Sequence, residues 1–190
     1  MRDIEIEIQA RIEKTNKLKD FLDKEAKFVS EKQQIDEYFV PAHRNFLNTK
    51  PIQEWFRLRN EKGVYSLNYK KWYYENGIGQ YADEFETKID DAESARKILL
   101  AIDCKSIVVV DKNRKKYMYN EYEIALDTVK GLGDFVEVEY KGKNHTEYKK
   151  ITTEMIDFLK MHDCGKIELN NGGYPYMMLF PEETNFIVVS

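Results

Sequence analysis

Apolar and polar residues alternate along much of this chain. Ile4, Ile6, Ile8 and Ala10 occupy every second position near the amino terminus, and the residues between them are polar. A period of two is typical of a β-strand, because successive side chains point to opposite faces. The same alternation predicts strands over residues 33–41, 55–59, 64–73, 84–89 and 107–117, and a two-stranded hairpin over 121–140. We therefore expect about eight strands, mostly antiparallel.

The hairpin has one charged face. Its turn lies in the sequence KGLGD, residues 130–134, and Asp127, Glu137 and Glu139 project from one side of the two strands. Adjacent carboxylates of this kind repel one another. A divalent cation or a cationic ligand would remove that cost, whereas solvation on an ordinary outer face is the alternative interpretation.

Three segments follow helical spacing instead. The first covers residues 15–30, with Thr15 as N-cap; the second follows the Asp90-Asp91 cap; and the third covers 146–163, before Gly165. Their predicted buried stripes are Leu18, Phe21, Leu22, Glu25 and Val29; Ala95, Ile98, Leu99 and Ile102; and Ile151, Met155, Phe158, Leu159 and His162. Residues 75–80 are predicted to be a flexible connection, and the apolar tail after residue 171 is expected to pack on the fold.

Length and composition predict one globular domain over residues 1–190. The chain is 42% hydrophobic and 34% charged, which is typical of a folded protein. A net charge of -4 gives no overall attraction to polymeric nucleic acid or anionic membranes, and no apolar run is long enough to span a bilayer. The start lacks a signal-peptide core, so we expect a cytoplasmic protein. Cys104 and Cys164 are expected to be buried reduced thiols, with a disulfide as the alternative.

Charged residues occupy one face of nearly every predicted strand. A two-layer sheet would leave them in water, whereas a closed barrel with a polar lumen would gather them and leave its apolar outer face to the helices. We therefore predict an α+β fold, a closed eight-stranded antiparallel β-barrel with helices packed outside. The cations concerned are Arg57, Arg59, Lys70, Lys112, Arg114 and Arg11, and the anions are Glu5, Glu7, Glu84, Glu86, Asp127, Glu137 and Glu139. Such a mixture fits a polyphosphate bound together with Mg²⁺ or Mn²⁺.

These motifs, in this order, resemble the CYTH family, the triphosphate tunnel metalloenzymes. The motifs are Glu5-x-Glu7, Arg57-x-Arg59, Lys70, Glu84-x-Glu86, Lys112-x-Arg114 and Leu126-Asp127 before GLGDFVEVE. The family comprises class IV adenylate cyclases, thiamine triphosphatases and inorganic triphosphatases. Two segments look most like the cyclase branch of the family. One is GLGDFVEVE, and the other is residues 174–179, which resemble the family's carboxyl-terminal motif Ser-Tyr-x-x-Leu-Leu.

The resemblance implies a triphosphate tunnel and assigns roles within it. Arg57, Arg59, Lys70, Lys112 and Arg114 would hold phosphates, and Glu5, Glu7, Glu137 and Glu139, with Glu86 in addition, would ligate Mg²⁺ or Mn²⁺. Asp127 would assist the attacking group, in a catalytic set with Lys112 and Arg114. The family's opening motif Glu-x-Glu-x-Lys has Gln9 at its lysine position here. Gln9 can hydrogen-bond a phosphate without a charge, and Arg11, one pleat further along the same face, is expected to compensate in part.

Three functions follow from this resemblance. The first is an adenylate cyclase that converts ATP into cyclic AMP and pyrophosphate. The second is a triphosphatase that acts on inorganic, thiamine or nucleoside triphosphate, and the third is a nucleotide-binding module without turnover, which Gln9 supports. The aromatic tail and the cluster of residues 72–74 suit either ordinary packing or a dimer contact, and the similarity to class IV cyclases favours a homodimer.

Overall fold

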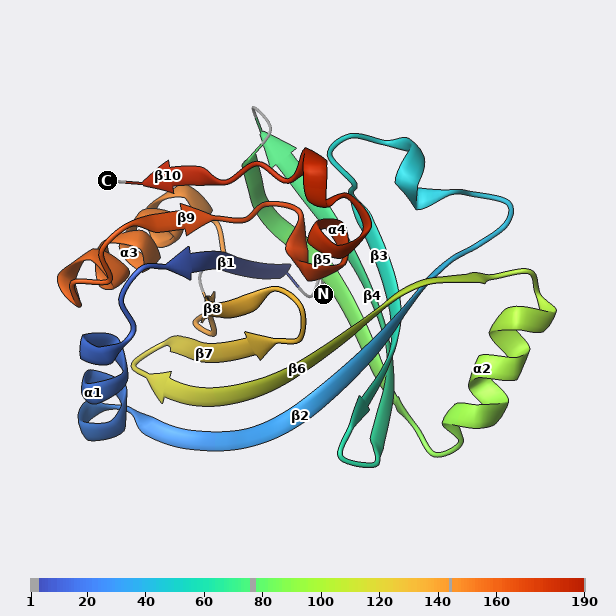
Figure 1. The fold of residues 1–190 in the computed structure, drawn as a ribbon, viewed down its shortest axis with the longest axis horizontal. Coiled ribbons are helices and arrows are strands. Elements are labelled where there is room, and N and C mark those ends of the chain that lie inside the picture. Colours follow the sequence, from blue (N-terminus) through green and yellow to red (C-terminus); the bar gives the residue numbers. More distant parts are fainter. Residues whose placement is uncertain (1–3, 76–77, 144, 190) are drawn as a thin grey trace.

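One continuous antiparallel sheet runs through the computed structural model, which describes residues 4–75, 78–143 and 145–189 (Figure 1). In these residues its strands are β1 (Ile4–Ile12), β2 (Lys27–Val40), β3 (Glu54–Glu61), β4 (Val64–Glu75), β5 (Ile78–Ile89), β6 (Lys105–Tyr119), β7 (Tyr122–Val129), β8 (Gly133–Tyr140), β9 (Ile167–Leu169) and β10 (Ile187–Val189). The helices are α1 (Asn16–Glu25), α2 (Ala92–Ala101), α3 (Tyr148–Met161) and α4 (Gly173–Leu179), with short 3₁₀ turns at Phe46–Asn48 and Pro181–Glu183.

The first eight strands close into a barrel. The order is β1-β5-β4-β3-β2-β6-β7-β8, and β8 pairs back onto β1. β1 closes the barrel because it pairs with both of the other end strands. Ile4 and Glu5 pair with β5, and residues 6–10 pair with β8. The end of β1 then pairs with β9, which carries β10. The predicted closed eight-stranded antiparallel barrel is confirmed.

The first helix is shorter than predicted. α1 ends at Glu25, Ala26 is extended, and Val29 belongs to β2 instead of the helix. β2 and β6 form the longest ladder of the barrel, beginning with Lys27 opposite Met118. This pairing, which depends on a segment about 90 residues away in the chain, outweighs the local helical spacing over residues 26–30.

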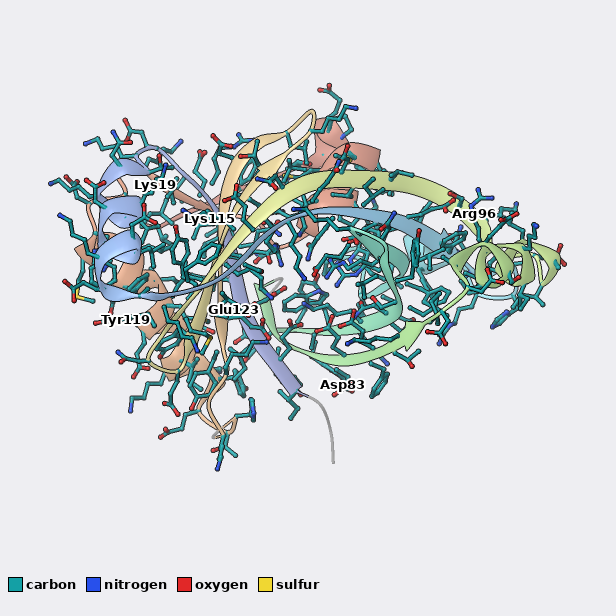
Figure 2. The ribbon with its side chains drawn as sticks, turned by 90° about the horizontal axis from the view of Figure 1, so that it is seen from below. Lys19, Asp83, Arg96, Lys115, Tyr119 and Glu123 are labelled. Atoms are coloured by element: carbon teal, nitrogen blue, oxygen red, sulfur yellow. The ribbon has the colours of Figure 1, made fainter. Side chains whose placement is uncertain are left out.

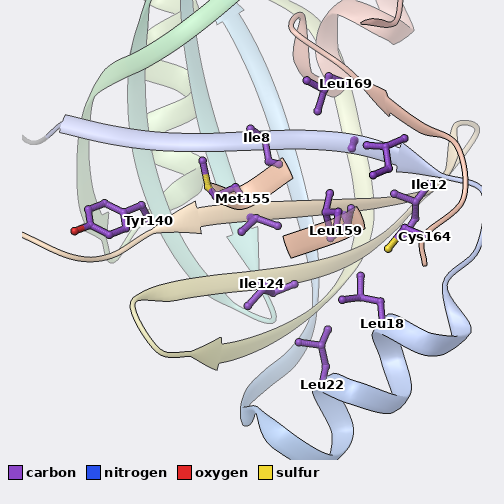
Figure 3. Close-up of a cluster of buried hydrophobic side chains, with 14 of the residues drawn as sticks. Ile8, Ile12, Leu18, Leu22, Ile124, Tyr140, Met155, Leu159, Cys164 and Leu169 are labelled. Carbon is purple, nitrogen blue, oxygen red and sulfur yellow. The ribbon is translucent and has the colours of Figure 1, made fainter. Parts of the chain in front are cut away.

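The apolar faces of β1, β7 and β8 point outward and are covered by α1 and α3 (Figure 3). Ile8 and Ile124 from the strands belong to one buried cluster with Leu18 and Leu22 from α1 and Leu159 from α3. Burial of these side chains contributes about 1.5–3 kcal/mol each before other costs are subtracted. The interior of the barrel is thereby left to the charged faces, as predicted.

The stripe predicted for α2 is wrong at two of its four positions, Ile98 and Ile102. Only Leu99 is buried, against Phe39 and Leu58 of the barrel wall, whereas Ile98 and Ile102 are 60% and 62% exposed. α2 lies at the side of the molecule opposite to α1 and α3, and one side of it packs against the barrel wall (Figure 1). The predicted cap is confirmed, because the Asp91 side chain accepts a hydrogen bond from the Ser94 amide at 2.9 Å.

The tail packs on the barrel, as expected, but through a helix that the pattern did not predict. Tyr174 and Met177 of α4 are buried in an apolar cluster with Trp55 and Phe135. Cys104 and Cys164 are both free and buried. Residues 76 and 77 of the predicted flexible connection lie outside the described residues, and no helix in the described ranges has the length and apolarity needed to cross a bilayer.

Candidate active site in the barrel lumen

A cavity of about 220 Å³ lies in the charged interior of the barrel. Its lining comes mostly from alternate residues of β1 to β8, together with Thr152 of α3 and the segment from Leu169 of β9 to Pro175 of α4. Figure 2 shows nitrogen and oxygen atoms of side chains gathered inside the ring of strands. The lining includes twelve of the predicted residues: Glu5, Glu7, Gln9, Arg57, Arg59, Lys70, Glu84, Glu86, Lys112, Arg114, Glu137 and Glu139.

Asp36 of β2, which lies outside the cavity lining, binds the side chains of Arg57 and Arg59 of β3. Asp36 accepts two hydrogen bonds of 2.7 Å from the Arg59 guanidinium, and Arg57 Nη1 lies 3.6 Å away. Burial alone would raise the pKa of Asp36, but the two guanidinium groups hold it well below its usual range. Arg57 Nε is buried without a hydrogen-bond partner, and other atoms of the Arg57 side chain line the cavity.

Arg114 of β6 lies at the centre of a second network. It binds both carboxylate oxygens of Asp127, through Nε at 2.7 Å and through Nη2, and its Nη2 also contacts Glu137. Burial would raise the pKa of Glu137, yet Arg114, Lys112 and a hydrogen bond from Gln9 hold it well below the usual value. Burial and the neighbouring Arg114 lower the pKa of Lys112 to about 8, against the opposing effect of Asp127.

Lys70 of β4 lies between two carboxylates of β1. It forms ion pairs with Glu5 and with Glu7, the latter at 2.6 Å. Burial raises the pKa of both acids, with Glu5 raised further by Glu7, and Glu7 further by Glu137 and Glu139, so one lysine does not offset their charge. Lys70 and Arg57 meanwhile lower the pKa of Glu84 to about 2 against the effect of burial.

The remaining predicted carboxylates also face the lumen. Glu139 lies directly opposite Glu7 on one side and Glu123 on the other in the strand register, and it pairs with Lys141. Glu86 accepts a hydrogen bond of 2.7 Å from Ser66 Oγ. A row of acids across three adjacent strands is costly unless cations neutralise it.

The donor set fits a hard divalent cation. The acids available on β1 and β8 offer only oxygen, which Mg²⁺ and Mn²⁺ prefer. Burial raises the pKa of Glu5 and of Glu7, and repulsion from the neighbouring acids adds to it. Within the described ranges, no three acidic, histidine or cysteine side chains are gathered closely enough to form a finished metal site. The carboxylates instead contact Lys70, Lys141 and Arg114.

Two predicted residues do not reach the lining. Arg11 lies with its guanidinium 4.6 Å from the centre of the Phe186 ring and 5.3 Å from that of Phe135, so it does not replace the charge that Gln9 lacks. Asp127 is fully buried behind Lys112 and Arg114, and it also accepts a hydrogen bond from Tyr174. Asp127 therefore lies outside the cavity lining, in contact with Lys112 and Arg114, and its predicted role in assisting the attacking group stays a prediction.

Sequence reasoning missed Asp36, Glu123, Asn170 and Tyr174. Asp36 shares its strand face with Gln34 and Tyr38, both buried, and this alternation was the available signal. Asn170 and Tyr174 come from a segment without strand periodicity. Residues 174–179 resemble the family's carboxyl-terminal motif, but that resemblance gave Tyr174 no role in the lumen.

The lining carries balanced charge. Among the described residues, seven cationic side chains and seven carboxylates face the cavity. The carboxylates are Glu5, Glu7, Glu84, Glu86, Glu123, Glu137 and Glu139, and the cations are Arg57, Arg59, Lys70, Lys112, Arg114, Lys116 and Lys141. A polyanion entering this lumen would therefore bring an uncompensated charge unless cations accompany it.

Comparisons with known proteins agree with this geometry. The model of the CYTH domain matches residues 3–168. A protein of Methanocaldococcus jannaschii named "Putative adenylate cyclase MJ0240" is 33% identical over 172 residues, which cover 90% of this chain and 96% of that protein.

Solved structures share the fold. The PH1819 protein of Pyrococcus horikoshii OT3 superposes with a TM-score of 0.77 at 23% identity, covering 94% of this chain and 99% of that one. The Hippeastrum protein HpAC1, described as a "putative adenylyl cyclase" with a dominant triphosphatase activity, has a TM-score of 0.62 at 18% identity and covers 94% of this chain and 95% of its own.

Proposed function

Because this chain belongs to the CYTH domain family, we propose that it is a metal-dependent enzyme acting on a triphosphate in the barrel lumen, and that its reaction converts ATP into cyclic AMP and pyrophosphate. CYTH proteins bind triphosphate substrates and generally use divalent metal ions. The observation that carries the proposal is the meeting of five predicted phosphate ligands with the carboxylates of β1 and β8 in one cavity.

The cations are arranged to hold a chain of phosphates. Arg57 and Arg59 approach from β3, Lys70 from β4, and Lys112 and Arg114 from β6, so three separate strands supply positive charge. Arginine binds phosphate oxygens through a planar fork, and lysine acts as a point charge. Asp36 and Asp127 fix the guanidinium groups before a substrate arrives, which lowers the entropy lost on binding.

The acids of β1 and β8 support the proposal of a divalent metal. Glu5 and Glu7, which share one lysine, would be its first ligands, with Glu139 directly opposite Glu7. A bound Mg²⁺ or Mn²⁺ would neutralise phosphate charge and orient the triphosphate. In this proposal Glu137 serves mainly to hold Arg114, because both of its carboxylate oxygens already accept hydrogen bonds.

The cyclase reaction is favoured by the name of the archaeal relative and by the aromatic side chains of the cavity. Trp55 and Trp72 line the cavity and offer apolar surface to a nucleobase. The ribose 3′-hydroxyl would attack the α-phosphorus, forming the cyclic phosphodiester while the bond to pyrophosphate breaks. Arg114 and Lys112 would stabilise the charge that develops on the phosphate oxygens.

Hydrolysis is the second candidate, favoured by the triphosphatase activity described for the Hippeastrum protein of the same fold. The same cations would then hold the triphosphate while water attacks the terminal phosphorus. The bond from that phosphorus to the bridging oxygen breaks, and the products are orthophosphate and the diphosphate remainder of the substrate. The two reactions differ in which nucleophile lies in line with which phosphorus.

Product analysis tests the proposal. Purified protein is incubated with ATP, GTP, tripolyphosphate or thiamine triphosphate in Mg²⁺ or Mn²⁺, with Glu5→Gln as a control for contaminating enzymes. We expect cyclic AMP and pyrophosphate from ATP. Orthophosphate without cyclic AMP would establish the second candidate instead, and metal-dependent binding without any product would leave only a nucleotide-binding module.

A further inference from the structure

A short segment beyond the part of the chain that matches the CYTH model completes one end of the lumen. The match ends at residue 168, yet Asn170, Asn171, Gly173, Tyr174 and Pro175 all line the cavity. Asn170 is 7% exposed and Tyr174 is 3% exposed, so both are interior residues. Each of them makes a directed hydrogen bond to the network around Arg114, by a different route.

The first route passes through Gln9. The Asn170 amide donates to the Gln9 carbonyl at 2.8 Å, and Asn170 Nδ2 donates to the Gln9 side-chain oxygen. Gln9 Nε2 in turn donates to Glu137 at 2.6 Å. The Asn170 side chain is itself oriented, because its Oδ1 accepts a hydrogen bond of 3.0 Å from the Gly172 amide.

This chain of contacts decides which end of the Gln9 amide faces Glu137. An amide side chain carries a donor at one end and an acceptor at the other. Since Asn170 presents a donor to Gln9 Oε1, Gln9 must turn its own donor toward the Glu137 carboxylate. The opposite orientation would place two acceptors together beside a buried acid, at a cost of about 1–3 kcal/mol.

The second route passes through Asp127. The Tyr174 hydroxyl donates to Asp127 Oδ2 at 2.8 Å, and its ring packs edge-on against Phe135 and under the Lys112 ammonium, 4.8 Å away. Burial and the nearby acids raise the pKa of Tyr174 well above its usual value, so the phenol remains a donor at neutral pH. Asp127, whose carboxylate is oriented by the Tyr174 hydroxyl, in turn accepts hydrogen bonds from the Arg114 guanidinium through both of its oxygens.

The two routes meet at one ion pair. Glu137 is held by Gln9 on one oxygen and by Arg114 on the other, and Arg114 is held by Asp127. We propose that Asn170 and Tyr174 are positioning residues, which set the orientation of Glu137 and Arg114 from outside the strands that carry them. This inference rests on the proposed function, because the positioned groups are those that would hold the triphosphate.

The Asn170 route is tested by a rescue. Asn170→Asp keeps the acceptor for Gly172 but removes the donor, so Gln9 turns its oxygen toward Glu137, and kcat/KM is expected to fall about tenfold or more. Adding Gln9→Lys supplies a group that donates to both carboxylates. The double variant is expected to recover kcat/KM to within about threefold of the wild type. Additive losses in the double variant would overturn this route.

The Tyr174 route is tested by a matched pair of substitutions in α4. Tyr174→Phe removes the hydroxyl and keeps the ring, and we expect kcat/KM to fall about tenfold. Tyr176→Phe is the control, because that hydroxyl contacts Glu183 on the exposed side. In Tyr174→Phe/Asp127→Asn the loss should equal that of Asp127→Asn alone, since Tyr174 acts only through Asp127. A loss in Tyr176→Phe as large as in Tyr174→Phe would overturn this route.

A second readout separates this inference from the proposed function. The thermal unfolding midpoint of each variant does not depend on turnover, and the midpoint lost in Asn170→Asp should be regained in the double variant with Gln9→Lys. If the wild type turns over no triphosphate but the midpoints show this rescue, the proposed function fails and the network stands. If the wild type is active while neither kcat/KM nor midpoint shows coupling, the inference fails alone.

Discussion

Two clusters in the same lumen shift the pKa values of their carboxylates in opposite directions. Around Arg114, Glu137 and Asp127 share a guanidinium, a lysine and neutral donors, and the pKa of Glu137 lies far below its usual value. Around Lys70, Glu5 and Glu7 share one ammonium group, and their pKa values are raised. Both clusters are buried, so burial alone does not explain the difference.

The difference lies in how many donors each carboxylate receives. Burial penalises an ionised acid in both places, but Arg114 and Gln9 supply Glu137 with directed donors, whereas Glu5 and Glu7 divide a single ammonium and repel each other. The Arg114 cluster is thus a finished structural unit. The Lys70 cluster is one that a further cation would complete, which is why we propose the metal there.

The largest effect is expected from breaking the finished cluster. Arg114→Ala leaves Asp127 and Glu137 buried without their main partner, which should lower the free energy of unfolding by about 3–5 kcal/mol. Activity should fall by 10³-fold or more, because one phosphate ligand and the orientation of two acids are lost together. Urea denaturation and steady-state kinetics measure both effects.

Arg11→Ala is the control for this prediction. Arg11 also contacts aromatic rings at the barrel wall but lies outside the lining, so its loss should cost about 1 kcal/mol and leave kcat/KM nearly unchanged. Equal losses of activity in Arg114→Ala and Arg11→Ala would contradict the proposal that Arg114 binds phosphate in the lumen.

An intermediate effect is expected from Glu7→Gln in the incomplete cluster. An acid whose pKa is raised on folding destabilises the folded state above its normal pKa, so neutralising Glu7 should raise stability at pH 7 without metal by about 1 kcal/mol, or roughly 2–4 °C. Lys70 keeps its partner Glu5. Activity should nevertheless fall about 100-fold, and stabilisation by added Mg²⁺ or Mn²⁺ should disappear.

Glu123→Gln provides the comparison, since Glu123 lines the same lumen but pairs with Lys116 at 2.7 Å. It should retain the stabilisation by metal that Glu7→Gln loses. If Glu7→Gln still gains stability from the metal as the wild type does, the Lys70 cluster is not the metal site.

The smallest effect concerns the pH profile. The pKa of Lys112 is lowered to about 8, so this lysine loses its charge as pH rises through that value. If its charge holds phosphate, kcat/KM should decline above about pH 8. Lys112→Arg should remove that decline, because a guanidinium stays charged, while Lys116→Arg should leave it in place. A profile that rises above pH 8 would instead mark Lys112 as a proton acceptor.

Much of the barrel was predictable because its signal is local. Strict alternation in residues 4–12 assigned Glu5 and Glu7 to one face and Ile6 and Ile8 to the other, and the structure confirms both faces. The predicted strand over residues 84–89 is also present, although β5 begins earlier, at Ile78. Alternation does not say where a ladder ends, because the partner strand decides that.

The errors share a physical cause. Val29 and Ile98 were assigned from helical spacing, but β6 pairs with the segment around Val29, and no described part of the chain buries the outer side of α2 at Ile98. By strand alternation, Arg11 lies on the same face of β1 as the residues that line the lumen. At that point, however, β1 pairs with β9 and no longer with β5. A local pattern cannot register contacts made by distant segments.

The sequence by itself determined which side chains share a face, because the period of a strand is written in consecutive residues. It thereby fixed the chemistry available to the lumen, five phosphate-binding cations and a set of oxygen donors. Only the tertiary structure decided how these groups are shared: that Asp127 lies behind Arg114, that Gln9 is oriented by Asn170, and that Tyr174 enters from the tail. Hydrogen-bond partners across 47 or 161 positions of separation depend on barrel closure, which no short window of sequence contains.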